Sequence, residues 1–133
     1  MEVFFIMCGI TAFTGQTSAL PFLLQGLEKL EYRGYDSAGV TLVDSQGLNT
    51  YKVKGRLSDL KEELKHQEHH QSTGIGHTRW ATHGIPSQLN SHPHTNRSNT
   101  ISIVHNGIIE NHQAIRNYLK EVGYPFVSQT DSE

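Results

Sequence analysis

The sequence contains only one cysteine, Cys8, among its 133 residues. No internal disulfide can form, so a reducing, cytoplasmic compartment is the expected location. The longest apolar run, residues 3–8, is far too short to cross a bilayer, and no basic residue precedes it as a secretory signal would require. These absences predict a cytoplasmic protein with no membrane partner.

The chain also lacks any block of like charge. Its 11 lysine and arginine residues stand against 13 aspartate and glutamate residues, for a formal net charge of −2. Proteins that bind nucleic acid neutralise phosphates with clustered lysine and arginine, so this composition predicts no nucleic-acid partner. With 35% hydrophobic and 18% charged residues, the chain fits one ordinary globular domain and excludes collagen-like or low-complexity sequence.

Apolar, β-branched stretches alternate with helical ones along the chain. Leucines at three- and four-residue steps predict a helix over residues 18–30, and further helices are expected over 57–67, capped by Ser58, and over 111–122, capped by Asn111. The predicted strands cover residues 3–13, 37–43, 50–54, 73–80, 101–105 and 126–128. Residues 86–99 are interpreted as a polar loop. This order fits an α+β layered domain.

Nine histidines raise the question of a metal site. His66, His69 and His70 lie near the end of the second predicted helix, and His92 and His94 lie in the predicted loop. Their spacings match no zinc template, and solvated histidines are favourable near a helix C-terminus. We therefore predict that the chain holds no metal, and we expect no cofactor.

Cys8 has two interpretations. A lone cysteine in a strand is most often a small hydrophobic residue. However, Gly9 leaves room for another group to approach the sulfur, and Met7 is a plausible start residue whose removal would leave Cys8 with a free α-amine. A thiol needs a nearby base to act at neutral pH, and an α-amine can be that base, directly or through one water. An internal Cys8 has only an amide nitrogen and no such base.

Three further segments carry dense polar residues within strand-like sequence. They are YRGYDSAG at 32–39, GHTRWATHG at 76–84 and HNGIIEN at 105–111. Buried polar groups must find partners, so polar clusters beside glycines at strand ends favour a binding site over a core. Taken singly each signal is weak, because an arginine in a strand can lie at the surface and Asn-Gly is most often a turn.

In this order, the CGI at residues 8–10, the three polar segments and the TDSE at 130–133 closely resemble one family. It is the glutaminase domain of the glutamine–fructose-6-phosphate aminotransferases, which are class II glutamine amidotransferases. The second and third segments distinguish it from amidophosphoribosyltransferase and asparagine synthetase. The resemblance implies a layered α/β/β/α sandwich of the N-terminal nucleophile hydrolase type, here incomplete at its C-terminus.

The resemblance implies a role for each matching position. Cys8 would be the nucleophile that attacks the side-chain amide of glutamine. The Asn106 side chain and the Gly107 backbone N–H would form the oxyanion hole. Glutamine is also a zwitterion, so its site needs a cation and an anion. Arg79 would bind the α-carboxylate and Asp131 the α-ammonium.

Four further positions complete the implied site. Thr82 and His83 would lie near the α-carboxylate, and Trp80 would line the route of ammonia to a second active site. For Arg33, support of the nucleophile strand and a functional role both stay open. The implied partners are L-glutamine and a C-terminal sugar-phosphate isomerase/transferase domain, with a homo-oligomer in the full-length protein.

The resemblance implies that the complete protein converts L-glutamine and D-fructose 6-phosphate into L-glutamate and D-glucosamine 6-phosphate, with a thioester at Cys8 that releases ammonia. Residues 1–7 are interpreted as a mis-assigned start or a removable extension, and residues 8–133 as part of the amidotransferase domain. Two alternatives remain. One is a non-catalytic fragment or glutamine-binding module with Cys8 still capped. The other is a different class II amidotransferase with another acceptor domain.

We expect the mature protein to begin at Cys8, because only then do the sulfur and a free amine belong to one residue. Intact-mass spectrometry and N-terminal sequencing of protein from its native cells measure this directly. A fully active protein that still carries residues 1–7 would contradict the mechanism. An inactive protein with an intact Met1 would favour the non-catalytic alternative.

Overall fold

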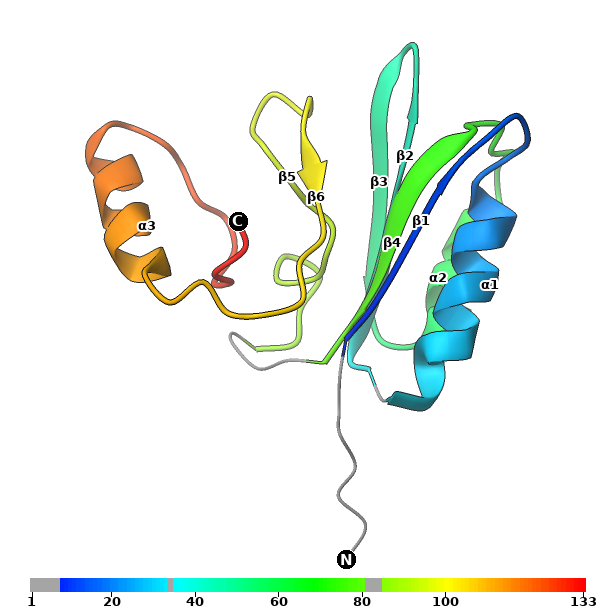
Figure 1. Cartoon of the computed structure of the whole chain (residues 1–133), viewed down its shortest axis with the longest axis horizontal. Helices are drawn as coiled ribbons and strands as arrows, with labels where there is room; N and C mark the ends of the chain where they lie inside the picture. The colour runs from blue at the N-terminus through cyan, green and yellow to red at the C-terminus, as the bar shows by residue number, and fades with distance from the viewer. Residues whose placement is uncertain (1–7, 34, 81–84) are drawn as a thin grey trace, which may run out of the picture.

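The computed structural model describes residues 8–33, 35–80 and 85–133. Figure 1 shows its layers: helices α1 (Leu20–Leu30) and α2 (Leu57–Leu64) cover one face of a four-stranded sheet. A two-stranded sheet and then helix α3 (His112–Glu121) lie beyond the other face. The short 3-10 helix Glu31–Arg33 follows α1. This is the α+β layered architecture that the sequence predicts.

The larger sheet is antiparallel, with the strand order β1-β4-β2-β3. Its strands are β1 (Gly9–Thr14), β2 (Ser37–Asp44), β3 (Gly47–Lys54) and β4 (Thr73–Arg79). The register pairs Gly9 with Thr78 and Ser37 with Arg79. The starts of β1 and β2 therefore meet the end of β4 at one end of the sheet, and Cys8 directly precedes β1 at that end.

The hydrophobic core lies between the larger sheet and its two helices. Its principal buried side chains come from α1, α2 and β2, namely Leu20, Leu23, Leu27, Val40, Leu42, Leu57, Leu60 and Leu64. The leucine spacing in α1 turns the apolar side chains to one face of that helix, as expected of an amphipathic helix packed on a sheet. The Phe13 ring of β1 stacks on the Phe22 ring of α1, with 4.4 Å between centroids. The core thus holds β1 firmly against α1.

The second helix differs from its prediction at both ends. It ends at Leu64 rather than at residue 67, and its N-cap is Arg56 rather than Ser58. The Asp59 carboxylate accepts the Arg56 backbone N–H at 2.7 Å. The predicted Ser58 cap is therefore wrong, because an acidic side chain in the first turn reaches back to the cap amide.

The middle of the segment predicted to be a polar loop, residues 86–99, is buried. Residues 90–94 are all buried, and His94–Thr95 forms strand β5, which pairs with β6 (Ser102–Ile103). The segment approaches the larger sheet closely at Gly39, where an added Cβ would lie 2.2 Å from the His92 carbonyl oxygen. Local composition did not reveal this, because the polar groups of the segment find their partners in distant parts of the fold.

Two predicted strands are shortened or replaced. Of residues 101–105 only Ser102–Ile103 is paired, and within the described structure residues 126–128 form no strand. The backbone N–H groups of Val127 and Ser128 donate instead to the Glu133 carboxylate, at 2.8 and 2.6 Å. A side chain thus satisfies the donors that a neighbouring strand would otherwise accept.

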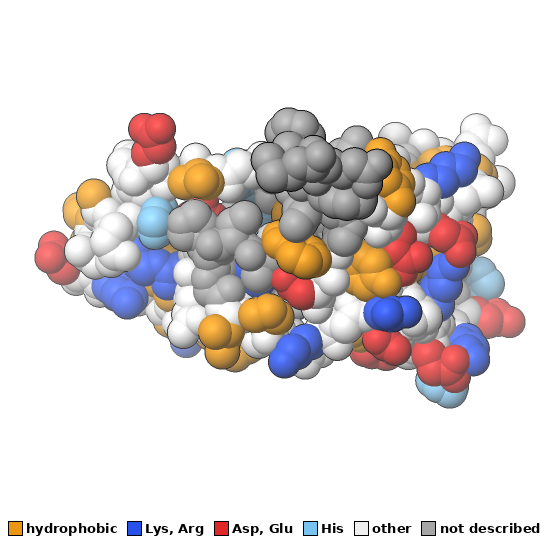
Figure 2. All heavy atoms as spheres, turned by 90° about the horizontal axis from the view of Figure 1, so that it is seen from below, with side chains coloured by type: hydrophobic (Ala, Val, Ile, Leu, Met, Phe, Trp, Pro, Cys, Tyr) orange, Lys and Arg blue, Asp and Glu red, His pale blue; other side chains and the backbone are white. Residues whose placement is uncertain are grey.

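The surface carries mixed charge. Figure 2 shows acidic and basic side chains interspersed over the side of the molecule where α1 and α2 lie. The Lys61 ammonium of α2, for example, lies 3.0 Å from the Glu28 carboxylate of α1. Within the part of the chain that the structure describes, no helix combines the length and apolarity needed to cross a membrane.

Candidate active site

Cys8 lies where β1 begins and β4 ends. Its sulfur accepts a hydrogen bond from the Trp80 backbone N–H at 3.2 Å, and it lies 3.6 Å from the Trp80 carbonyl oxygen. The thiol side chain is half-buried. The β1–β4 pairing therefore places the predicted nucleophile directly against the residue that follows β4.

The space beside Gly9 is occupied by packing. An added Cβ at Gly9 would lie 2.8 Å from the Leu30 side chain and 2.9 Å from the Thr78 hydroxyl. The position of Gly9 beside Cys8 predicts room for a group approaching the sulfur. In the structure, side chains of α1 and β4 fill that space instead. Gly9 is therefore required for the close packing of β1.

Asn106 reaches Cys8 from the segment that follows β6. Its side-chain Nδ2 donates to the Cys8 carbonyl oxygen at 3.1 Å, and its Oδ1 lies 2.7 Å from His77 Nε2. The next residue, Gly107, has a φ of 146°, a conformation that favours glycine. The Asn-Gly pair predicted for the oxyanion hole thus lies beside the predicted nucleophile.

Asp131 is held by the same segment. One carboxylate oxygen accepts the Ile109 backbone N–H at 2.7 Å, and the other accepts the Ser132 hydroxyl at 3.1 Å. Burial alone would raise the pKa of Asp131, but these hydrogen bonds outweigh it and lower that pKa below its ordinary value. Asp131 is therefore an anion at neutral pH, as recognition of an ammonium group requires.

Arg79 ends β4 and is buried, with 5% of its surface exposed. Its carbonyl oxygen accepts the Asp36 backbone N–H at 2.7 Å, which ties the end of β4 to the start of β2. The side chain of Arg79 is thus buried one residue before Trp80. A buried guanidinium group can bind a carboxylate by strong charge-assisted hydrogen bonds.

The predicted site residues are therefore brought together to different extents. Cys8, Trp80 and Asn106 are in direct contact. Arg79 joins them through its neighbour Trp80, and Asp131 joins them through the segment that carries Asn106. Three predictions lie outside the described residues, namely Thr82, His83 and the side chain of Arg33.

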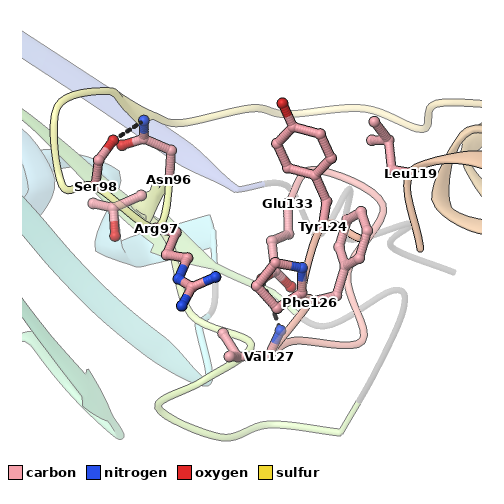
Figure 3. Close-up of a pocket in the computed structure, with 10 residues that line it drawn as sticks. Asn96, Arg97, Ser98, Leu119, Tyr124, Phe126, Val127 and Glu133 are labelled. Carbon is pink, nitrogen blue, oxygen red and sulfur yellow. Dashed lines mark hydrogen bonds between the residues drawn. The ribbon is translucent and has the colours of Figure 1, made fainter. Parts of the chain in front are cut away.

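Two cavities lie near the C-terminal segment. One of about 980 Å³ opens between the turn that joins β5 to β6 and the segment after α3, where Arg97, Tyr124, Phe126 and Val127 line it (Figure 3). Its lining does not include the predicted site residues. A smaller cavity of about 150 Å³ is bordered by Asp131. The predicted anion thus borders a small hollow rather than the large one.

A cluster of three buried histidines, His77, His92 and His94, was not predicted from the sequence. The His92 ring lies between those of His77 and His94, at centroid distances of 4.3 and 4.5 Å. His94 Nε2 also lies 2.8 Å from the Thr130 hydroxyl. Burial lowers the pKa of His77 and of His94 to about 4, and burial together with the neighbouring histidines lowers the pKa of His92 to about 2. A histidine within an apolar strand was the available signal for His77, but no local pattern pointed to its stacking partner.

Comparison with known proteins identifies the family of the chain. Residues 49–133 match the family model described as a glutamine amidotransferase domain. The chain belongs to the glutamine amidotransferase domain family. Curated relatives of this amidotransferase domain are named glutamine–fructose-6-phosphate aminotransferase [isomerizing].

These relatives are much longer than the chain. The Clostridium tetani protein is 57% identical over 127 residues, which cover 96% of this chain and 21% of the relative. The Synechocystis protein is 50% identical over 127 residues, which cover 96% of this chain and 20% of the relative. The amidotransferase domain described here thus spans about a fifth of the length of the curated relatives it matches.

Solved structures show the same fold. The glutamine phosphoribosylpyrophosphate amidotransferase from B. subtilis matches with a TM-score of 0.78 at 24% identity, over 92% of this chain and 27% of that chain. A structure described as the allosteric regulatory enzyme of purine biosynthesis matches with a TM-score of 0.80 at 25% identity and the same coverage. The predicted layered fold of the N-terminal nucleophile hydrolase type is confirmed.

The lowered histidine pKa values make a prediction about stability. Unfolded histidines bind protons near their ordinary pKa, whereas His77 and His94 remain neutral in the folded state down to about pH 4. The unfolded state therefore binds more protons, and the free energy of unfolding falls as the pH drops below about 6.5. The expected slope approaches about 1.4 kcal/mol per pH unit for each buried histidine. Urea denaturation at about pH 7.5, 6 and 5 measures it.

A matched pair of variants assigns this slope. His94→Gln is expected to lower the slope of the free energy of unfolding against pH by the contribution of nearly one proton, because a buried titratable group is removed. His66→Gln makes the same change at an exposed side chain and should leave the slope as in the parent protein. Equal slopes in the parent and in His94→Gln would contradict the assignment.

Proposed function

We propose that this domain hydrolyses L-glutamine to L-glutamate and ammonia, with Cys8 as the nucleophile. One observation carries the proposal: the Cys8 sulfur and the Asn106 amide meet at the same end of the sheet, joined by the 3.1 Å hydrogen bond from Asn106 Nδ2 to the Cys8 carbonyl oxygen. A thiol with N–H donors beside it is what hydrolysis of an amide requires.

The reaction runs through a thioester. The Cys8 sulfur attacks the amide carbon of glutamine, and the thiol proton passes to the α-amine of Cys8 once that residue is N-terminal. Asn106 Nδ2 and the Gly107 N–H donate to the oxyanion, and each such donor contributes about 100- to 1000-fold in rate. The C–N bond then breaks, and the leaving nitrogen takes up the proton as ammonia. Water hydrolyses the thioester, which releases glutamate and restores the thiol.

The other end of glutamine is held by opposite charges. Arg79 binds the α-carboxylate and Asp131 binds the α-ammonium. The lowered pKa of Asp131 supports its role, since it keeps the carboxylate charged at neutral pH, and the burial of Arg79 favours strong charge-assisted hydrogen bonds to a carboxylate. We further propose that Thr82 and His83 assist at the α-carboxylate, that Trp80 lines the path of ammonia, and that Arg33 supports the nucleophile strand or the substrate.

The names of the relatives support a further proposal about the whole protein. They are glutamine–fructose-6-phosphate aminotransferases, so we propose that the ammonia is used to make glucosamine 6-phosphate from fructose 6-phosphate. The residues that bind the sugar phosphate would belong to the part of the relatives that this chain does not match. A homo-oligomer and a cytoplasmic location stay predictions.

Replacing Cys8 by alanine is expected to abolish glutamine hydrolysis in the full-length protein, because no other described side chain is placed as a nucleophile against Asn106. Formation of glucosamine 6-phosphate from added ammonia should survive and serves as the folding control. Glutamate release and product formation are measured in parallel. Normal glutamine turnover by Cys8→Ala would overturn the proposal.

Replacing Asp131 by asparagine is expected to act on binding. Asparagine keeps an oxygen that can accept the Ile109 N–H but removes the charge that pairs with the α-ammonium. The KM for glutamine should rise about 10- to 100-fold with a much smaller change in kcat, since a hydrogen bond to a charged group contributes about 1.5–3 kcal/mol. Glu110→Gln, at an exposed acid in the same part of the chain, is the control. An unchanged KM in Asp131→Asn would remove Asp131 from the site.

A further inference from the structure

We propose that His77 is a positioning residue for the oxyanion hole, whose Nε2–H binds the Asn106 amide oxygen and so directs the amide NH2 toward Cys8. This inference rests on the proposed function, because it assigns a purpose to the orientation of Asn106. His77 itself makes no contact with the reacting atoms in this proposal and acts through Asn106.

The hydrogen bonds around Asn106 determine which nitrogen of His77 carries the proton. Asn106 Nδ2 donates to the Cys8 carbonyl oxygen at 3.1 Å, so the opposite atom of the amide, Oδ1, faces His77. An amide oxygen only accepts hydrogen bonds, so the 2.7 Å contact requires a proton on His77 Nε2. A flipped amide would set its oxygen against the Cys8 carbonyl oxygen, which is repulsive.

The His77 ring is itself held in place by stacking. His77 is 1% exposed, and its ring lies 4.3 Å from the His92 ring at an interplanar angle of 25°. Gly39 is paired with His77 in the sheet, and an added Cβ at Gly39 would lie 2.2 Å from the His92 carbonyl oxygen. The absence of a side chain at Gly39 therefore lets His92 approach the sheet beside His77. This gives a structural role to the last glycine of the YRGYDSAG segment.

The protonation state supports the same arrangement. Burial lowers the pKa of His77 to about 4, so the ring is neutral at neutral pH and carries one N–H proton. With that proton on Nε2, His77 can only donate to Asn106. The amide has one favourable orientation and needs no rearrangement when negative charge develops on the substrate oxygen.

Kinetics of the full-length protein test the role of the donor. His77→Phe keeps an aromatic ring for stacking but has no N–H, and it should lower kcat for glutamine hydrolysis about 10- to 100-fold with KM within about 3-fold. His77→Gln places an N–H near the position of Nε2 and should recover activity to within about 5-fold of the parent. His66→Phe, at an exposed histidine, is the control and should match the parent. Equal losses in His77→Phe and His77→Gln would overturn the proposal.

A double-mutant cycle separates positioning from a general structural effect. In an Asn106→Ala protein there is no amide left to orient, so adding His77→Phe should cause no further loss of kcat. Ammonia-dependent product formation reports that each variant is folded. A full additional loss in the Asn106→Ala background would contradict the proposal.

The proton position is tested without any activity measurement. NMR of the parent protein with ¹⁵N-labelled histidine should show that His77 is protonated at Nε2. The His77 signal is assigned by its disappearance in His77→Gln. The same signal should shift in Asn106→Ala, because its hydrogen-bond partner is lost. A proton on Nδ1 would overturn the inference, even if His77→Phe failed to fold. A parent protein that does not hydrolyse glutamine would overturn the proposed function instead. In that case the NMR result would still show whether His77 orients the amide, because it reports the Nε2 proton and the effect of Asn106 on it.

Discussion

The antiparallel pairing of β1 with β4 is the interaction on which the site depends. It sets Gly9 opposite Thr78, and just beyond this pair the Cys8 sulfur accepts the backbone N–H of Trp80. The same strand, β4, carries His77 toward Asn106. A shift of one residue in this register would turn every side chain of β4 to the opposite face of the sheet. The proposed nucleophile, the buried arginine and the histidine that contacts Asn106 are therefore positioned by one set of backbone hydrogen bonds.

A short segment after β6 connects the two ends of the substrate site. Asn106 contacts Cys8, and three residues later the Ile109 N–H holds Asp131. In the proposed reaction these are the amide end and the ammonium end of glutamine. His105 strengthens the connection, because its Nδ1 lies 3.0 Å from the Ser132 hydroxyl that donates to Asp131. The distance between the proposed oxyanion hole and the carboxylate proposed to bind the α-ammonium is thus set within one stretch of backbone.

The buried histidines form a polar layer between the larger sheet and the β5–β6 pair. Polar groups in such a position need partners, and His77 Nε2 finds one in the amide of Asn106 and His94 Nε2 in the hydroxyl of Thr130, while the rings also pack on one another. Burial keeps the rings neutral, so they add no charge beside the proposed nucleophile. The cost is a fold that loses stability in acid, because protons bind these histidines only after unfolding.

Local sequence patterns were enough to predict the strongly periodic elements and the order of the site motifs. The leucines of α1 and the hairpin of β2 and β3 follow from local spacing and turn chemistry, and Cys8, Asn106 and Asp131 were found because their motifs resemble a known family. The burial of residues 90–94 and the packing of His92 on His77 beside Gly39 became visible only in the folded chain. These contacts join segments far apart in the chain, and a local pattern of polar and apolar residues does not record which distant segment will cover it.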